Sequence, residues 1–172
     1  MCGIFAILKI KNYKNIFHEI IDGLIQLQNR GYDSSGISLL DKNGNIILHK
    51  YASDNISSID KLKNINIGQN DNINVGVGHN RWATHGPKND INAHPHFSNN
   101  KKFIIVHNGI IENYKDLKNF LIKNNHTFYS LTDTEVIVNL LQFYYEINYN
   151  IDEAIKKTIN KLEGTYGLII LS

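Results

Sequence analysis

The sequence has almost no cysteine and no long hydrophobic run, and each absence excludes a class of protein. Cys2 is its one cysteine among 172 residues, which excludes an intramolecular disulfide framework. Apolar runs such as FIIV at 103–106 and LIIL at 168–171 are far shorter than the ~20 residues of a transmembrane helix. A basic leader with a small-residue cleavage site is missing from the N-terminus. We therefore expect a cytoplasmic protein with no membrane partner.

An excess of charge of one sign is also missing. Lys and Arg total 18 and Asp and Glu total 16, a formal net charge of +2 with the histidines counted neutral. Because the basic residues are scattered along the chain, we expect no nucleic acid as a partner. Glycine motifs that bind phosphate are absent, since neither G-x-G-x-x-G nor a lysine-ended P-loop occurs. We expect no cofactor.

The pattern of apolar residues predicts one α+β domain over residues 1–172, because helices and strands alternate irregularly, with hairpins as well as crossovers. Helices are predicted over residues 15–28, 57–65, 109–125, 133–148 and 152–164. Strands are predicted over residues 2–9, 36–40, 46–51, 73–83, 102–108 and 166–172. The stretch 84–100 has no period and holds both prolines, so we expect a long loop there, of a length that is usually functional or disordered.

Cys2 stands directly behind Met1, which is unusual for the one strong nucleophile of a chain. Removal of Met1 is expected because residue two is small, and it would leave Cys2 with a free α-amine beside its thiol. The amine has an ordinary pKa of about 7.7–8.0 and the thiol one of about 8.5, so one residue would supply nucleophile and general base. The alternative is a buried cysteine that acts only as a small apolar side chain.

A nucleophile that attacks a carboxamide needs hydrogen-bond donors where negative charge develops on the oxygen. The segment VHNGIIENY at 106–114 offers two of them. Asn108, at the end of a predicted strand, has a side-chain N–H, and Gly109 has a backbone N–H with no side chain in the way. The alternative is an ordinary Asn-Gly turn.

The segment GHNRWATHG at 78–86 groups four candidates for substrate binding as a strand leaves the sheet. Arg81 could hold a substrate carboxylate with two parallel hydrogen bonds. Trp82, Thr84 and His85 follow it directly. The alternatives are a surface cation for Arg81 and a core position for Trp82.

Asp133 and Arg30 complete the candidates. Asp133, in LTDTEV at 131–136, could bind a substrate ammonium; the alternative is a helix cap made by Thr132 or Asp133 with Glu135 following. Arg30, in NRGYDSSG at 29–36, could hold the cysteine strand and nearby loops through hydrogen bonds, or it could sit on a helix C-terminus.

Five histidines lie within one region and raise the question of a metal: His79, His85, His94, His96 and His107. The H-E-x-x-H spacing is absent, and the one cysteine lies elsewhere in the sequence. We therefore expect no metal, and a zinc-binding protein is the weaker alternative.

Seven short blocks occur along the chain in the order MCGIFA, NRGYDSSG, NRWATHG, NAHPH, VHNGIIENY, TDTEV and LEGTYG. Together they resemble, over essentially the whole chain, the class II glutamine amidotransferases of the N-terminal nucleophile hydrolase fold. The blocks are most similar to those of the glutaminase domains of glutamine–fructose-6-phosphate aminotransferases. Amidophosphoribosyltransferases resemble RGQD and RYSTAG where this chain has RGYD and RWATHG.

The resemblance implies a four-layer αββα sandwich and a glutaminase reaction. Cys2 would attack the side-chain amide of L-glutamine and form a γ-glutamyl thioester, releasing ammonia, and water would then release glutamate. Asn108 and Gly109 would form the oxyanion hole. No metal or cofactor is implied.

The resemblance also implies how glutamine would be bound. Arg81 would bind the carboxylate, with Thr84 and His85 on the same substrate-covering loop, and Asp133 would hold the α-ammonium. Trp82 would help to gate the passage of ammonia towards a synthase site.

In the family, the ammonia serves the conversion of fructose 6-phosphate to glucosamine 6-phosphate. The resemblance places the sugar site in sugar-isomerase domains that are absent here, so we expect a glutaminase domain truncated at its C-terminus. A synthase domain or a second copy would be its partner. The alternatives are the glutaminase domain of another amidotransferase, such as an amidophosphoribosyltransferase, or a non-catalytic remnant that binds glutamine or a partner.

The chain departs from the family pattern at two positions in these blocks. Ser35 stands where the family usually has alanine, and Asn80 stands where it usually has threonine. Both changes are small and polar, and we expect the fold to tolerate them.

Overall fold

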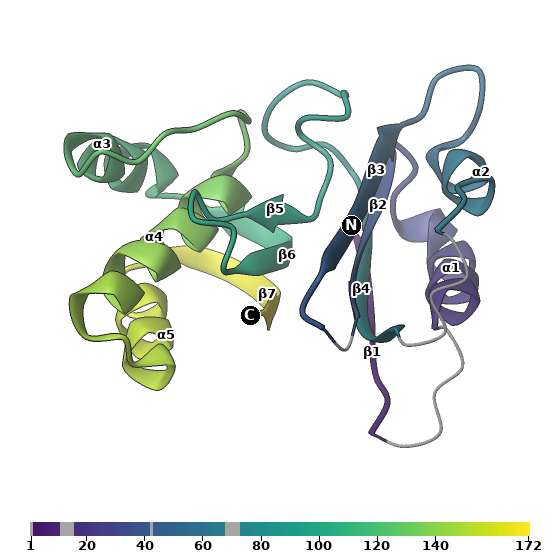
Figure 1. Ribbon diagram of the computed structural model, residues 1–172. Helices are drawn as coiled ribbons and strands as arrows, with labels where there is room; N and C mark the ends of the chain where they lie inside the picture. Colours follow the sequence, from purple (N-terminus) through teal and green to yellow (C-terminus); the bar gives the residue numbers. More distant parts are fainter. Residues whose placement is uncertain (1, 11–15, 42, 68–72) are drawn as a thin grey trace. The chain divides into compact units, whose positions relative to one another are not determined.

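The computed structural model describes residues 2–10, 16–41, 43–67 and 73–172 (Figure 1). The chain divides into two compact units. Unit 1 comprises Met1–Ala83 and Pro87–Pro95, and unit 2 comprises Thr84–Gly86 and His96–Ser172. Met1, whose removal is predicted, and Asn15, where the first helix is predicted to begin, lie outside the described residues.

Unit 1 is an antiparallel sheet with helices on one face (Figure 1). Its described strands run in the order β1-β4-β2-β3 across the sheet, with bounds Gly3–Leu8, Ile73–Arg81, Ser34–Asp41 and Ile46–Ala52. Helix α1 spans Phe17–Gln26, a 3-10 turn η1 follows at Gln28–Arg30, and α2 spans Ser58–Lys63. The predicted hairpin at 36–51 and the predicted buried strand at 73–83 are confirmed, and that strand, β4, lies inside the sheet.

Helix α1 lies close to β4 because two glycines of β4 leave room for its side chains. A Cβ added at Gly76 would lie 2.5 Å from Ile20 Cδ1, and one added at Gly78 would lie 3.0 Å from Ile20 Cγ2 and from Leu24 Cδ1. Ile20 and Leu24 are fully buried. The two glycines therefore allow the close approach of helix and strand.

Unit 2 is a smaller antiparallel sheet covered by helices (Figure 1). Its described strands have the order β5-β6-β7 and span His96–Phe97, Ile104–Ile111 and Gly164–Leu171. Helices α3, α4 and α5 span Tyr114–Lys123, Asp133–Asn148 and Ile151–Ile159. Helix α4 packs on β5 and β6, and α3 and α5 pack on α4. The first ten residues of α4 are all buried, because the sheet and both neighbouring helices surround it.

Two differences between the structure and the sequence prediction arise from strand pairing. Strand β6 does not end at Asn108 but continues to Ile111, paired throughout with β7, so residues 109–111 are not helical. The stretch 84–100 contains a short strand, β5 at His96–Phe97. Apolar spacing within each segment could not reveal these features, since the first depends on pairing with the distant strand β7 and the second on pairing with β6. The α+β class is confirmed, and the described strand pairs are antiparallel.

The two departures from the family pattern contact each other inside unit 1. Ser35 and Asn80 are opposite each other in the β2–β4 register, and Ser35 Oγ donates to Asn80 Oδ1 at 2.8 Å. Asn80 Nδ2 donates to the Leu24 carbonyl at 2.7 Å, and Ser58 Oγ donates to Ser35 Oγ at 2.8 Å. One buried polar chain thus connects α1, β4, β2 and α2.

This contact predicts that the two residues are energetically coupled. Ser35→Ala leaves the buried Asn80 amide oxygen without its donor, so we expect it to lower the free energy of unfolding by about 1–3 kcal/mol. Adding Asn80→Thr should cost less than the two single changes together, with a coupling of about 1 kcal/mol in a double-mutant cycle. Urea unfolding of the four proteins measures these values.

Ser38→Ala is the matched control on the same strand. Ser38 is fully buried on β2, and its Oγ has no hydrogen-bond partner among the described residues. Its replacement should therefore change the free energy of unfolding little. Strictly additive effects of the Ser35 and Asn80 substitutions would contradict the prediction.

Candidate functional site

Cys2 lies directly before β1, and strand pairing brings it to the end of β4. Gly3 pairs with Asn80, so Cys2 lies beside the residues that follow β4. The Trp82 backbone N–H donates to Cys2 Sγ at 3.2 Å, and Sγ lies 3.5 Å from the Trp82 carbonyl oxygen, to which it can donate. Cys2 forms no disulfide and is partly buried. Its position is therefore set by backbone atoms of another strand.

The surroundings of Cys2 act on its pKa in opposite directions. Burial raises the pKa of the thiol, and the negative charge of Asp33 raises it further. The Trp82 N–H and the positive charge of Arg81 lower the pKa, but burial outweighs them. Within unit 1 the thiol form is thus favoured at neutral pH, and a base close to the sulfur is needed for it to act as a nucleophile.

Arg30 contacts the cysteine strand from the 3-10 turn that follows α1. Its Nε donates to the Cys2 carbonyl oxygen at 3.2 Å. It is also the last residue of η1, so both features weighed for it occur together. This contact holds the backbone of Cys2 and does not involve its thiol.

Arg81 is not at the surface and Trp82 is not in the core, so neither structural alternative holds for them. Arg81 is only 3% exposed, so it is not a surface cation, and its Nη1 donates to the Pro87 carbonyl at 3.3 Å. Trp82 is 44% exposed, so it is not a core residue. Its ring makes an edge contact with Tyr32, with ring centroids 5.4 Å apart. An exposed aromatic pair therefore lies beside the backbone that contacts Cys2.

Asp33 is a further polar residue of this region that the sequence prediction did not include. Its N–H donates to the Arg81 carbonyl at 3.1 Å, and its Oδ2 accepts the Ala83 N–H at 2.8 Å. Asp33 thus holds the backbone on both sides of Trp82. The one available signal was an acidic residue inside the NRGYDSSG block.

In unit 2, Asn108 and Gly109 lie within β6. Asn108 pairs with Gly167, and Gly109 pairs with Tyr166. Gly109 has a φ of +138°, and a Cβ there would lie 2.0 Å from the Thr165 carbonyl oxygen. The alternative of an ordinary Asn-Gly turn is wrong, because the strand continues through both residues. Only glycine fits this backbone without strain.

At the start of α4, the structure shows whether Thr132 or Asp133 caps the helix. Thr132 is the N-cap, and its Oγ1 accepts the Glu135 N–H at 3.3 Å. Glu135 in turn accepts the N–H groups of Tyr129 and Ser130. The cap alternative is therefore confirmed for Thr132 and wrong for Asp133. Asp133 Oδ2 instead accepts the Ile111 N–H at 2.9 Å, which ties α4 to β6.

His107 is buried between β6 and the start of α4. Its Nδ1 lies 2.9 Å from Thr134 Oγ1 and 4.0 Å from Asp133 Oδ2. Burial lowers the pKa of His107; the Asp133 carboxylate opposes this and the nearby His85 adds to it. The His85 ring contacts Tyr114, with centroids 5.0 Å apart, and Thr84 is exposed.

The predicted residues therefore fall into two sets. Unit 1 brings together Cys2, Arg30, Arg81 and Trp82, and unit 2 holds Thr84, His85, Asn108, Gly109 and Asp133. The described part of the chain contains no group of three or more His, Cys, Asp or Glu side chains arranged to hold a metal ion.

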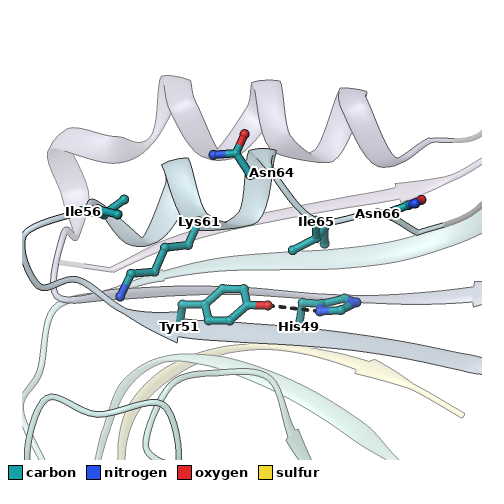
Figure 2. Close-up of a pocket in the computed structure, with 7 residues that line it drawn as sticks. All are labelled: His49, Tyr51, Ile56, Lys61, Asn64, Ile65 and Asn66. Atoms are coloured by element: carbon teal, nitrogen blue, oxygen red, sulfur yellow. Dashed lines mark hydrogen bonds between the residues drawn. The ribbon is translucent and has the colours of Figure 1, made fainter.

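A pocket of about 550 Å³ opens between β3 and α2 of unit 1, and its lining includes none of the predicted residues (Figure 2). His49 and Tyr51 line it from β3, and Figure 2 shows their hydrogen bond, 3.4 Å from Nδ1 to the hydroxyl. The Lys61 ammonium at its edge is bound to the Ala52 carbonyl and to Asp54. Among the helices of the described residues, none is long and apolar enough to cross a membrane.

Comparison with known proteins gives one consistent result. A sequence profile described as "Glutamine amidotransferase domain" matches residues 66–172. The chain is 43% identical over 171 residues to glutamine–fructose-6-phosphate aminotransferase (isomerizing) of Caldanaerobacter subterraneus subsp. tengcongensis. It is 40% identical over 171 residues to the protein of the same name from Pyrococcus horikoshii. These alignments cover 99% of the chain but only 26% and 27% of the relatives, so the chain spans about a quarter of their length.

Solved structures give the same fold. Glutamine phosphoribosylpyrophosphate amidotransferase from B. subtilis, complexed with ADP and GMP, matches with a TM-score of 0.80 and 26% identity. A structure described as the allosteric regulatory enzyme of purine biosynthesis matches with a TM-score of 0.82 and 26% identity. Both alignments cover 99% of this chain and 35% of the other. The predicted N-terminal nucleophile fold class is confirmed.

The buried His107 predicts a dependence of stability on pH. Its pKa in the folded chain is below the ordinary value of about 6.5, so the unfolded chain binds the proton first as the pH falls. The free energy of unfolding should therefore fall as the pH drops below ~6.5 towards the folded pKa. In His107→Asn, which does not titrate there, part of this fall should be missing. Urea unfolding between pH 7.5 and 5 measures it, and parallel curves would contradict the assignment.

Proposed function

Because the chain belongs to the glutamine amidotransferase domain family, we propose that it hydrolyses L-glutamine to glutamate and ammonia through a thioester on Cys2. The observation that carries the proposal is the contact of Cys2 Sγ with the Trp82 N–H, which holds the one thiol of the chain beside the buried Arg81. A cysteine that acted only as a small apolar side chain would not need this donor.

The reaction follows from the chemistry of an N-terminal cysteine. After removal of Met1, the α-amine of Cys2 takes the thiol proton as Sγ attacks the side-chain amide carbon of glutamine. The amine then returns the proton to the amide nitrogen, the C–N bond breaks, and ammonia leaves a γ-glutamyl thioester. Water, deprotonated by the same amine, attacks the thioester and releases glutamate and the thiol. Because burial raises the pKa of the Cys2 thiol, the thiol needs a nearby base, and the α-amine supplies it.

We assign the oxyanion donors and the substrate contacts by the resemblance of the motifs. Asn108 Nδ2 and the Gly109 N–H would stabilise the oxyanion. Arg81 would bind the glutamine carboxylate and Asp133 its ammonium. Each unit by itself supports this assignment. In unit 1, Arg81 is buried and the Pro87 carbonyl holds its Nη1. In unit 2, the Ile111 N–H of β6 holds the Asp133 carboxylate.

Trp82, Thr84 and His85 would cover the substrate. Trp82 is exposed, as a residue that gates the passage of ammonia must be, and its ring is braced by Tyr32. Arg30 would act through the Cys2 carbonyl, by fixing the strand that carries the nucleophile.

We further propose that the ammonia serves the formation of glucosamine 6-phosphate from fructose 6-phosphate. The support is the name shared by relatives that are about 40% identical over essentially the whole chain. The alternative, the glutaminase domain of an amidophosphoribosyltransferase, fits less well, because the matched structure of that kind is only 26% identical to the chain. A synthase domain or a second copy of the chain would complete the activity. The reactive thiol suits a reducing compartment such as the cytoplasm.

The proposal predicts that Cys2 hydrolyses glutamine only when its α-amine is free. In a chain carrying an N-terminal extension that a protease removes directly before Cys2, the extended form should release no glutamate from glutamine. Cleavage should start the release. A glutamine analogue with an electrophilic carbon should add one equivalent of mass to the cleaved form, measured on the intact protein.

Cys2→Ala, cleaved in the same way, is the control. Loss of the nucleophile should reduce glutamate release by a factor of about 10⁴ or more and abolish labelling. Binding of glutamine to this variant in calorimetry would show that the site remains intact. Full hydrolysis by Cys2→Ala, or binding without turnover by the cleaved chain, would refute the proposed activity.

A further inference from the structure

Lys50 is a cation of unit 1 for which the proposed reaction has no use, and its ammonium group lies among three backbone carbonyl oxygens. Nζ is 2.8 Å from the Ala93 oxygen, 3.0 Å from that of Ile91 and 3.4 Å from that of Pro95. A lysine ammonium has three N–H donors. Lys50 belongs to β3, whereas its three acceptors belong to the segment Pro87–Pro95, so one side chain fixes that segment to the sheet.

Other contacts hold the same segment, which we call the 87–95 segment. Asp90 Oδ1 accepts the Ala52 N–H at 2.6 Å, at the end of β3. The His94 ring stacks on that of His79 in β4, with centroids 4.1 Å apart. A Cβ added at Gly36 would lie 2.1 Å from the His94 carbonyl oxygen, so the segment lies directly on β2. Its last residues, Asn92–Pro95, are buried.

The start of the 87–95 segment contacts Arg81. The Pro87 carbonyl oxygen accepts Arg81 Nη1 at 3.3 Å and Asn92 Nδ2 at 2.8 Å. Asn92 lies between Ile91 and Ala93, whose carbonyl oxygens Lys50 holds. Lys50 therefore fixes the backbone of Asn92, Asn92 fixes Pro87, and Pro87 holds one nitrogen of Arg81.

The orientation of Arg81 matters because a guanidinium binds a carboxylate through two parallel hydrogen bonds in one plane. A fixed acceptor for one nitrogen limits the rotation of that plane. A small misplacement of a positioning group is enough to weaken binding or slow a reaction substantially.

We propose that Lys50 is a positioning residue for glutamine: through the 87–95 segment it orients the Arg81 guanidinium that receives the substrate carboxylate. This inference rests on the proposed function, in which Arg81 binds that carboxylate. It concerns the affinity for glutamine and not the reactivity of Cys2.

The test separates these two properties in the cleaved chain that begins at Cys2. Lys50→Met keeps the aliphatic stem and removes the ammonium. The concentration of an electrophilic glutamine analogue that half-saturates labelling of Cys2 should rise about tenfold, while the maximal labelling rate stays within about twofold. Iodoacetamide, which has no carboxylate for Arg81, should alkylate Cys2 at the wild-type rate. Lys50→Arg, which restores a cationic donor, should return the half-saturating concentration towards that of the wild type.

Two further variants sharpen the outcome. Asn92→Ala removes the bond to Pro87 without touching Lys50 and should shift half-saturation in the same direction. Lys61→Met is the matched control. Lys61 also binds a backbone carbonyl, that of Ala52 at the end of β3, and it pairs with Asp54, so both of these partners lie outside the 87–95 segment. It should leave half-saturation unchanged.

Unchanged half-saturation in Lys50→Met and Asn92→Ala would overturn the inference while leaving the proposed function intact. Equal losses with the analogue and with iodoacetamide would also overturn it, since they would indicate general distortion around Cys2. A wild-type chain that the analogue never labels would overturn the proposed function, and this inference with it.

Discussion

The antiparallel pairing of β1 with β4 determines where the one cysteine of the chain can lie. Gly3 opposite Asn80 places Cys2 beside the residues that leave β4, where the Trp82 N–H contacts its sulfur. Strand β4 also pairs with β2, whose N-terminal neighbour Asp33 binds the backbone on both sides of Trp82. The segment that carries Cys2 is thus held by contacts with two parts of the chain that are distant from it in sequence.

The polar residues near Cys2 and at the start of α4 are buried, and buried polar groups are costly unless they are hydrogen-bonded. In both units the partners are largely backbone groups. Arg81 donates to the Pro87 carbonyl, and Lys50 donates to carbonyls of the same 87–95 segment. Asp133 accepts the Ile111 N–H in unit 2. Each of these charged side chains is thus held by a backbone group of another segment of the chain.

The buried polar contacts of Ser35 and Asn80 use different groups from those that contact Cys2. Their side chains form a buried contact with each other and with α1 and α2. The contacts of Cys2 involve the backbone of Trp82 and the side chain of Arg30. The Ser35 hydroxyl and both polar atoms of the Asn80 amide thus each have a hydrogen-bond partner in the core of unit 1.

The sequence by itself determined the elements whose signals are local. The α4 span of 133–148 and the β2–β3 hairpin follow from apolar periodicity and turn signals within a few residues. The ordered motifs also determined the family. The tertiary structure alone decided that β6 continues through Asn108 and Gly109, that Asp33 holds the Trp82 backbone, and that Lys50 holds the 87–95 segment. Each of these depends on partners far along the chain, and periodicity within a short window carries no information about which distant strand or carbonyl a residue will meet.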